Sequence, residues 1–237
     1  MSEKVCLVLI GDSDIFRWPN ELLPTIHEKL VGDDMIVNQS RSGALLQDLP
    51  KQAETAINIL ISKFGDSQIS TPTSTELVIL ACAGENDVSS NFSLDPILQA
   101  FEEFVRIIFT SLISDDITMR HLIFLGPKLE PWLKHDMHSR KSYFKLSKSL
   151  DRACKRLQSS ICNNLCSDGG DIGEKKYMTS FVDCLTLFCG ETANLPGAVM
   201  GGNAVAQNHY FYDDGLHLSP EGYQIWKELI EKMLNAN

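Results

Sequence analysis

Short runs of consecutive apolar residues, separated by longer amphipathic stretches, restrict most strongly how this chain can fold. The clearest runs occupy residues 5–10 (VCLVLI) and 77–81 (LVILA), and shorter ones occupy 35–37 and 121–125. Strands of a parallel sheet are buried on both faces, so their sequences are continuously apolar rather than alternating. Runs of this kind at helix-length intervals are typical of βαβ units. The sequence therefore predicts a parallel sheet with helices packed against it.

The stretches between these runs complete a doubly wound three-layer α/β/α sandwich with a central, mostly parallel five-stranded sheet. The last helix is the best marked, because Ser219 suits an N-cap and Pro220 suits the first helical position. Its apolar stripe consists of Tyr223, Trp226, Leu229, Ile230 and Met233. Other helices are expected over 21–30, 45–64, 96–113 and 140–162, a fifth strand within 179–187, loops over 67–74 and 167–173, and a pocket wall or cover over 188–212.

Length and charge narrow the classes of function. A chain of 237 residues suits one α/β domain, spanning residues 1–237. The formal net charge is −10 and the basic residues are scattered, so binding to nucleic acid or to an anionic lipid surface is not expected. The apolar run at 5–10 is too short for a signal-peptide core or a membrane span. We therefore expect a cytoplasmic protein without a membrane span.

The cysteines and histidines do not suggest a metal site or a disulfide framework. Seven cysteines form an odd set without short paired zinc spacing, and Cys6 and Cys82 lie inside apolar runs as small core residues. His135 and His138 lie among charged residues, which favours a solvated surface. No Walker A loop and no Rossmann glycine pattern is present. The sequence predicts no cofactor and no metal.

Polar and small residues follow three of the expected strands. Gly11-Asp12-Ser13 follows the first, a segment that includes Gly43 follows the second, and Gly84-Glu85-Asn86-Asp87 follows the third. Ligands of open α/β sheets bind beyond the carboxyl ends of the strands. These residues are therefore expected to meet at one edge of the sheet.

A carboxylate and an imidazole share a short turn before the last helix, in the segment 213–217 (DDGLH). A serine nucleophile needs a base for its proton, and the base needs a partner that fixes its tautomer. His217 and Asp214 can supply both functions. Taken singly, Ser13 reads as a helix cap and His217 as a surface histidine, so the functional interpretation depends on all the blocks together.

The four blocks, in this order along the chain, resemble those of the SGNH (GDSL-like) hydrolases, which have a flavodoxin-like α/β fold. The resemblance implies that Ser13 is the nucleophile, His217 the general base and then acid, and Asp214 the residue that orients it. Asp213 is the rival carboxylate, and the family spacing favours Asp214. The oxyanion hole implied by the resemblance consists of the backbone N–H groups of Ser13 and Gly43 and the side-chain amide of Asn86.

The chain departs from the family pattern at two positions: Asp14 stands where the family name implies Leu, and Ser40 stands where the second block often has Gly. Asp14 places a negative charge beside the nucleophile, and Arg17 is the expected neutralising cation. Asp87 is interpreted as structural support. Position 15 is Ile, so no Gly-x-Ser-x-Gly elbow of an α/β-hydrolase is present.

The predicted activity is hydrolysis of a small-molecule carboxylic ester through an acyl-enzyme on Ser13. An acyltransferase using the same site and a non-catalytic binding module on the same fold are the alternatives. The loop after 121–125, with Pro131 and Trp132, is either a pocket wall or a plain surface loop, and the three tryptophans are interpreted as partial core. The sequence specifies neither the ester nor the oligomeric state.

Overall fold

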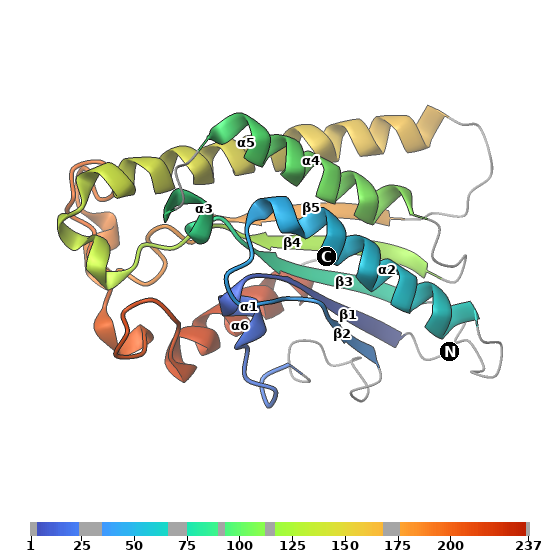
Figure 1. Cartoon of the computed structure of the whole chain (residues 1–237), viewed down its shortest axis with the longest axis horizontal. Coiled ribbons are helices and arrows are strands. Elements are labelled where there is room, and N and C mark those ends of the chain that lie inside the picture. Colours follow the sequence, from blue (N-terminus) through green and yellow to red (C-terminus); the bar gives the residue numbers. More distant parts are fainter. Residues whose placement is uncertain are drawn as a thin grey trace.

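The computed structural model describes residues 4–23, 35–65, 75–89, 93–111, 117–167 and 176–235. Its centre is a sheet in the strand order β2-β1-β3-β4-β5, and every neighbouring pair is parallel (Figure 1). This order is the one found in flavodoxin-like doubly wound folds. The strands are β1 Lys4–Gly11, β2 Ile36–Asn38, β3 Thr75–Cys82, β4 Ile117–Leu125 and β5 Lys176–Val182.

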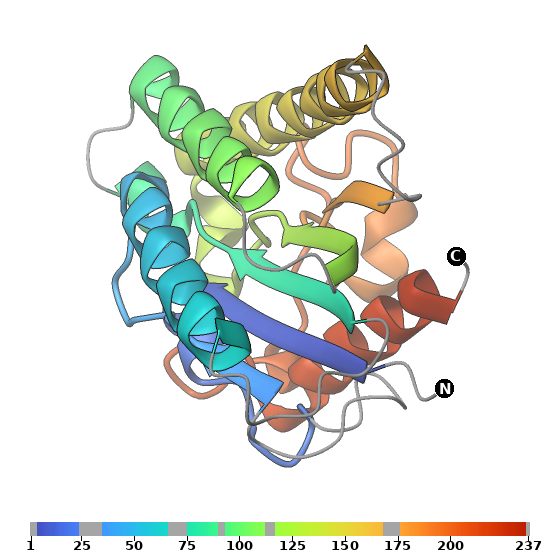
Figure 2. The same ribbon diagram turned by 90° about the vertical axis from the view of Figure 1, so that its right-hand side faces the viewer.

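Helices cover both faces of the sheet, which confirms the three-layer prediction. Helices α2, α4 and α5 lie on one face, and α6 lies on the other with the short α1 (Figure 2). The helices are α1 Ser13–Phe16, α2 Leu49–Gly65, α3 Glu85–Ser89, α4 Leu94–Thr110, α5 Met137–Ser167 and α6 Pro220–Asn235. Short 3-10 helices occupy η2 Leu46–Asp48, η3 Pro131–His135, η4 Gly190–Asn194 and η5 Asn208–Tyr210.

Strand β1 is apolar throughout because its two faces enter two different cores. Val8 and Ile10 pack in the core beneath α2, α4 and α5, whereas Leu7 and Leu9 pack in the core that contains Trp226 of α6. All four strand residues are at most 1% exposed. Burying an aliphatic side chain of this size contributes about 1.5–3 kcal/mol relative to leaving it in water. A polar residue at any of these positions would therefore weaken one of the two cores.

The last helix has the expected start and the expected buried face. The hydroxyl of Ser219 accepts a hydrogen bond from the backbone N–H of Gly222 at 3.3 Å, and Pro220 is the first helical residue. Trp226 is fully buried and stacks on Trp18, with ring centroids 5.8 Å apart. This packing holds α6 against the sheet close to the end of β1.

Several boundaries differ from the prediction. Strand β5 begins at Lys176, before the predicted residue 179. It is an edge strand whose residues 177–181 are only half-buried, so its sequence is less apolar than those of the central strands and marks its start less clearly. Helix α5 begins at Met137 and continues to Ser167, beyond the predicted 140–162. The predicted loop over 67–74 lies outside the described residues, as do most of the helix over 21–30 and of the loop over 167–173. Trp132 is not core, because 45% of its surface is exposed.

Residues 188–212 form turns and short 3-10 helices that are held by a buried arginine. The guanidinium of Arg140, at the start of α5, donates hydrogen bonds to the carbonyl oxygens of Ala198, Val199 and Ala204. Arg140 is only 1% exposed. The segment is therefore fixed to α5 by hydrogen bonds from the Arg140 side chain to its main-chain carbonyl oxygens. Among the helices that the structure describes, none combines the length and the apolar character needed to cross a membrane.

A buried histidine in β4 predicts a pH dependence of stability. His121 is fully buried, and its Nε2 lies 2.9 Å from the hydroxyl of Ser180. Burial lowers the pKa of His121 to about 4, from about 6.5 in the unfolded chain. The fold favours the neutral imidazole of His121. The resulting contribution to the free energy of unfolding is complete above pH 6.5 and is lost as the pH falls through 4. At about 1.36 kcal/mol per pKa unit, the loss is about 3 kcal/mol.

The measurement is the free energy of unfolding in urea at several pH values between 7 and 4. We expect His121→Leu to be less stable than wild type at pH 7, because it leaves the Ser180 hydroxyl without its partner, but to lose about 3 kcal/mol less on acidification. The control is His138→Leu, because His138 is exposed. An unchanged pH slope in His121→Leu would contradict the prediction.

Candidate active site

The residues predicted to act in catalysis follow the carboxyl ends of β1, β2 and β3 or precede α6. The chain after β2 runs alongside the end of β1, since the backbone N–H of Arg41 donates to the carbonyl oxygen of Gly11 at 3.0 Å. The backbone N–H of Asp12 in turn donates to the carbonyl oxygen of Cys82, the last residue of β3, at 3.0 Å. The three strand ends are therefore joined directly, as the order of the sheet requires.

Ser13 lies at the junction between β1 and α1. Asp12 is the N-cap of α1 and accepts the backbone N–H of Asp14, which makes Ser13 the first residue of the helix. Gly11 has a φ of +147°, and a Cβ at this position would lie 2.1 Å from the carbonyl oxygen of Cys82. Only glycine allows this close approach. The side chain of Gln52 binds both the N–H and the carbonyl of Gly11, at 2.8 and 3.1 Å, and fixes the turn that carries the half-buried Ser13.

Gly43 and Asn86 are brought together by hydrogen bonds between their loops. Gly43 has a φ of +75°, a left-handed conformation that glycine adopts readily. The amide Nδ2 of Asn86 donates to the carbonyl oxygen of Ala44, the residue after Gly43, at 3.1 Å. The carboxylate of Asp87 accepts the backbone N–H of Leu46 at 3.0 Å, and Asp87 is buried. Asp87 therefore has the supporting role expected of it.

The side chains of Asp214 and His217 form a hydrogen-bonded pair on a narrow hairpin. His217 Nδ1 lies 2.7 Å from Asp214 Oδ2, and Asp214 Oδ1 accepts the backbone N–H groups of Leu216 and His217 at 2.9 and 3.0 Å. Burial alone would raise the pKa of Asp214, but the hydrogen bond from His217 and the two backbone N–H groups lower it to about 2. Asp214 is therefore ionised at neutral pH and favours the proton on Nδ1. This leaves the lone pair on Nε2, as a general base requires.

The hairpin that carries His217 is linked to the element that carries Ser13. It is closed by the bridge between Phe211 and Leu218 and by the hydrogen bond from the Tyr212 N–H to the His217 carbonyl oxygen at 2.8 Å. Helix α6 starts three residues later, and its Tyr223 hydroxyl donates to the carbonyl oxygen of Asp14 at 2.8 Å. This contact is buried. It fixes the chain after His217 to the first turn of α1.

A buried ion cluster that the sequence analysis did not predict joins the first turns of α1 and α3. Its cation is Lys128, in the chain after β4, which is fully buried. The Lys128 Nζ lies 2.6 Å from Asp14 Oδ2, 2.7 Å from Glu85 Oε2 and 3.7 Å from Glu130 Oε1. Arg17, the expected neutralising cation for Asp14, is instead exposed. The expectation about Arg17 was wrong because a partner distant in sequence is closer in space.

The carboxyl groups of the cluster outnumber its cation. Burial is the largest effect on Asp12 and Glu85, and it raises both pKa values well above the ordinary range; the charge of Asp14 raises the pKa of Asp12 further. Burial would lower the pKa of Lys128, but Asp14, Glu85 and Glu130 hold it above its usual value. The carboxylates around Lys128 therefore favour its charged form.

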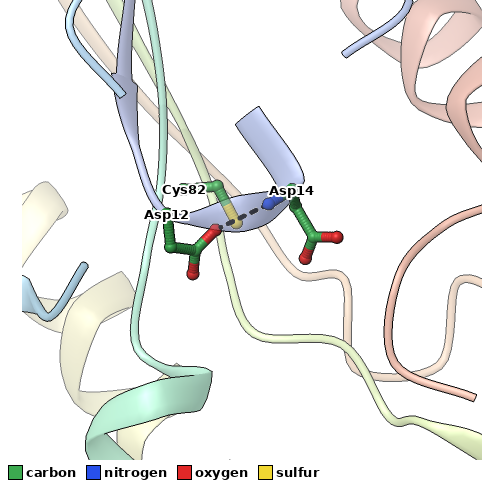
Figure 3. Close-up of side chains that lie close together, drawn as sticks. All are labelled: Asp12, Asp14 and Cys82. Atoms are coloured by element: carbon green, nitrogen blue, oxygen red, sulfur yellow. Dashed lines mark hydrogen bonds between the residues drawn. The ribbon is translucent and has the colours of Figure 1, made fainter. Parts of the chain in front are cut away.

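Asp12, Asp14 and Cys82 lie close together in this region, with the Asp14 N–H directed at the Asp12 carboxylate (Figure 3). One ligand atom from each side chain, a carboxylate oxygen or the thiol sulfur, lies within 4.8 Å of the other two, a spacing that a metal ion could bridge. Two observations argue for an ion network instead. The Lys128 ammonium already contacts Asp14, and burial, with the charge of Asp12, raises the pKa of the Cys82 thiol well above its ordinary range. We interpret the group as part of the buried cluster.

The loop after β4 is not a plain surface loop. Its residues 128–130 are buried, and its next residues line an open hollow of about 610 Å³. Pro131 also lies near the hairpin, with its Cβ 3.8 Å from the position that a Cβ on Gly215 would occupy. The hollow is lined by Pro131, Lys134, Cys189, Thr192, Val205, Ala206, Gln207, Asn208 and His209. Both the loop and part of the segment 188–212 therefore form the wall of a hollow.

Comparison with known proteins shows the fold. No protein-family model and no curated protein sequence matches the chain. Solved structures do match, with low sequence identity but nearly complete coverage of this chain. A candidate platelet activating factor from Streptococcus pneumonia is 16% identical with a TM-score of 0.54, and covers 98% of this chain and 84% of its own.

Two further matching structures are described as an esterase and an acylhydrolase. A carbohydrate esterase of family 3 from Talaromyces cellulolyticus is 13% identical with a TM-score of 0.53, and covers 100% of this chain and 97% of its own. A candidate acylhydrolase from Bacteroides fragilis is 15% identical with a TM-score of 0.50, and covers 99% and 87%. The chain thus shares its α/β fold with these three structures. The doubly wound α/β fold that the sequence predicts is therefore confirmed.

Proposed function

We propose that this protein is a serine-dependent hydrolase of carboxylic esters of small molecules, and that it acts through an acyl-enzyme on Ser13. The observation that carries the proposal is the Asp214–His217 pair, 2.7 Å apart, on a hairpin anchored through Tyr223 to the helix that begins with Ser13. An orienting carboxylate, an imidazole and a serine at a strand end are the groups that acyl transfer by serine requires.

In the first half-reaction, Ser13 Oγ attacks the ester carbonyl carbon while His217 Nε2 takes the hydroxyl proton. The carbonyl π electrons move to the oxygen and give a tetrahedral oxyanion. When this intermediate collapses, the bond to the alkoxy group breaks and His217 donates its proton to the departing alcohol. Asp214, ionised because its pKa is lowered to about 2, stabilises the imidazolium between these two transfers.

In the second half-reaction, water replaces the alcohol. His217 takes a proton from the water while the water oxygen attacks the acyl carbon. The ester bond to Ser13 then breaks. Ser13 Oγ recovers the proton from His217, and the carboxylic acid departs. Chemically, all proton transfers are completed by the side chains named, so the proposal requires no cofactor.

The oxyanion is proposed to bind the backbone N–H groups of Ser13 and Gly43 and the amide of Asn86. The hydrogen bond from Asn86 Nδ2 to the Ala44 carbonyl oxygen supports this assignment, because it fixes the orientation of the Asn86 side chain. It also places the Asn86 side chain beside the loop of Gly43. Donors held in place before the reaction stabilise the developing charge without reorganisation.

Asn86→Ala is expected to lower kcat by about 10²–10³, which is the usual effect of removing one oxyanion donor. KM should change little, because the hydrogen bond strengthens only as charge develops in the transition state. Steady-state kinetics on the best p-nitrophenyl ester would measure both constants. The control is Asn203→Ala, which removes a surface amide that binds the Pro196 carbonyl. A kcat within about threefold of wild type would remove Asn86 from the proposed mechanism.

The function itself is tested with p-nitrophenyl esters from acetate to palmitate and with a fluorophosphonate that phosphonylates activated serines. Ester hydrolysis together with a single label on Ser13, located by mass spectrometry, is the expected result. Adding competing alcohols distinguishes hydrolysis from acyl transfer, because a transferase would convert the acyl group into a new ester. Neither hydrolysis nor labelling, in folded protein, would favour a non-catalytic binding module.

A further inference from the structure

Lys128 connects two loops that carry proposed oxyanion donors. Its ammonium group contacts Asp14 Oδ2 at 2.6 Å and Glu85 Oε2 at 2.7 Å, and its backbone N–H donates to Glu85 Oε1 at 2.9 Å. Asp14 directly follows Ser13, and Glu85 directly precedes Asn86. One fully buried side chain therefore spans from the first turn of α1 to the first turn of α3.

Stability alone does not explain this arrangement. Moving charged groups out of water is unfavourable, and buried ion pairs are often no more stabilising than well-packed apolar residues of similar volume. An apolar residue at position 14, as the resemblance to GDSL-like hydrolases implies, would avoid this desolvation. The ionic contacts instead fix geometry. Each short charge-assisted hydrogen bond holds a carboxylate in one position and thereby restrains the adjacent main chain.

The other contacts of the two carboxylate residues support this effect. The carbonyl oxygen of Asp14 accepts the Tyr223 hydroxyl, so residue 14 is held on its backbone as well as on its side chain. Glu85 is held by both the ammonium and the backbone N–H of Lys128. Without Lys128, two buried carboxylates would face the same space without their shared cation and would repel each other.

We propose that Lys128 is a positioning residue that sets the distance between the backbone N–H of Ser13 and the side-chain amide of Asn86 in the oxyanion hole. This inference rests on the proposed function, because it assigns a role relative to those donors. Lys128 itself touches no reacting atom. A displacement of about 1 Å at a reacting centre can lower a rate by about 10²-fold. We therefore expect loss of the Lys128 bridge to lower kcat by about 10- to 100-fold with little change in KM.

Two variants remove the bridge in different ways. Lys128→Met removes the cation alone and leaves the carboxylates unpaired. The triple variant Asp14→Leu, Glu85→Gln, Lys128→Met removes the ionic bridge together with the charges of both carboxylates that it joins. The more distant Glu130 keeps its hydrogen bonds from Trp132 and Tyr143. The glutamine introduced at position 85 can still accept the backbone N–H of residue 128 through its amide oxygen. The matched control is Lys155→Met, which removes an exposed lysine that pairs with Asp151 at 2.7 Å.

A double-mutant cycle with Asn86→Ala separates positioning from a general structural effect. Each variant is made in the wild-type and in the Asn86→Ala background, and kcat, KM, circular dichroism and the melting temperature are measured. If Lys128 acts through the placement of Asn86, the triple variant should lose about 10- to 100-fold in kcat alone but less than about threefold once Asn86 is absent. Lys155→Met should match wild type throughout.

Three results would overturn the proposal: a triple variant with the kcat of wild type, the same factor of loss in both backgrounds, or unfolding of both bridge variants, which would make the cluster purely structural. The fluorophosphonate distinguishes these from a failure of the proposed function. Labelling of wild-type Ser13 with additive losses rejects only the positioning role of Lys128. If wild type is neither labelled nor hydrolytic, the proposed function and the role of Lys128 are both rejected.

Discussion

Ser13→Ala is expected to lower kcat for ester hydrolysis by about 10⁶ while leaving the fold unchanged. In serine hydrolases, removing the nucleophile alone is about as damaging as removing the complete triad, because the side chains act as a unit. The side chain is half-buried, and the turn around it is fixed by the main chain of Gly11 and by Gln52 rather than by its hydroxyl. The loss should therefore be chemical and not conformational.

Steady-state kinetics, labelling by the fluorophosphonate and thermal unfolding together measure this prediction. The matched control is Ser142→Ala on α5, whose hydroxyl donates to the His138 carbonyl oxygen of its own helix, 3.4 Å away. The variant at position 13 should keep the melting temperature of wild type and take up no label. Retention of more than about a hundredth of the wild-type kcat would show that another residue is the nucleophile.

Asp214→Asn is expected to lower kcat by about 10⁴. In a serine triad this substitution keeps the geometry but favours the wrong tautomer of the histidine, because an amide can donate to Nδ1 where the carboxylate could only accept. Asp214 Oδ2 is the atom that faces His217 Nδ1, at 2.7 Å. The asparagine can still accept the backbone N–H groups of Leu216 and His217 through its remaining oxygen, so the hairpin should persist.

Asp213→Asn is the matched control for this experiment, since it makes the same change one residue earlier. We expect its kcat to stay within about threefold of wild type, because the structure places Asp214 and not Asp213 against the imidazole. Measuring both variants from pH 6 to pH 9 on the same ester compares the two carboxylates directly. Equal losses in the two variants, or a greater loss at position 213, would contradict the assignment.

The central strands could be predicted from sequence because burial on two faces leaves a direct local signal. Residues of β1 and β3 enter cores on both sides of the sheet, so polar residues are excluded from long stretches of each strand. The signal is weaker at the edge. Residues 177–181 of β5 are half-buried, and polar residues such as Thr179 are tolerated there, which explains why the sequence predicts this strand only as part of a later segment.

The sequence supplies the proposed members of the candidate site, but not the residues that support them. Blocks after strand ends or before a helix start are visible in the sequence, and the resemblance to SGNH hydrolases selects five residues within them: Ser13, Gly43, Asn86, Asp214 and His217. The sequence does not single out Lys128, since a lysine in a loop ordinarily indicates solvent exposure. Lys128 binds Asp14 and Glu85, which lie 114 and 43 residues away along the chain, so no local pattern reveals the cluster.

The sequence by itself determined the order of the elements, the face that the last helix buries and the order of the four blocks. These properties follow from local periodicity and from capping, which act over a few residues. Tertiary structure alone decided which charges meet: it paired Asp14 with Lys128 rather than with the nearby Arg17, and joined Asn86 to the loop of Gly43. Electrostatic partners depend on distance and burial, and both arise only when the strand ends are brought together by the sheet.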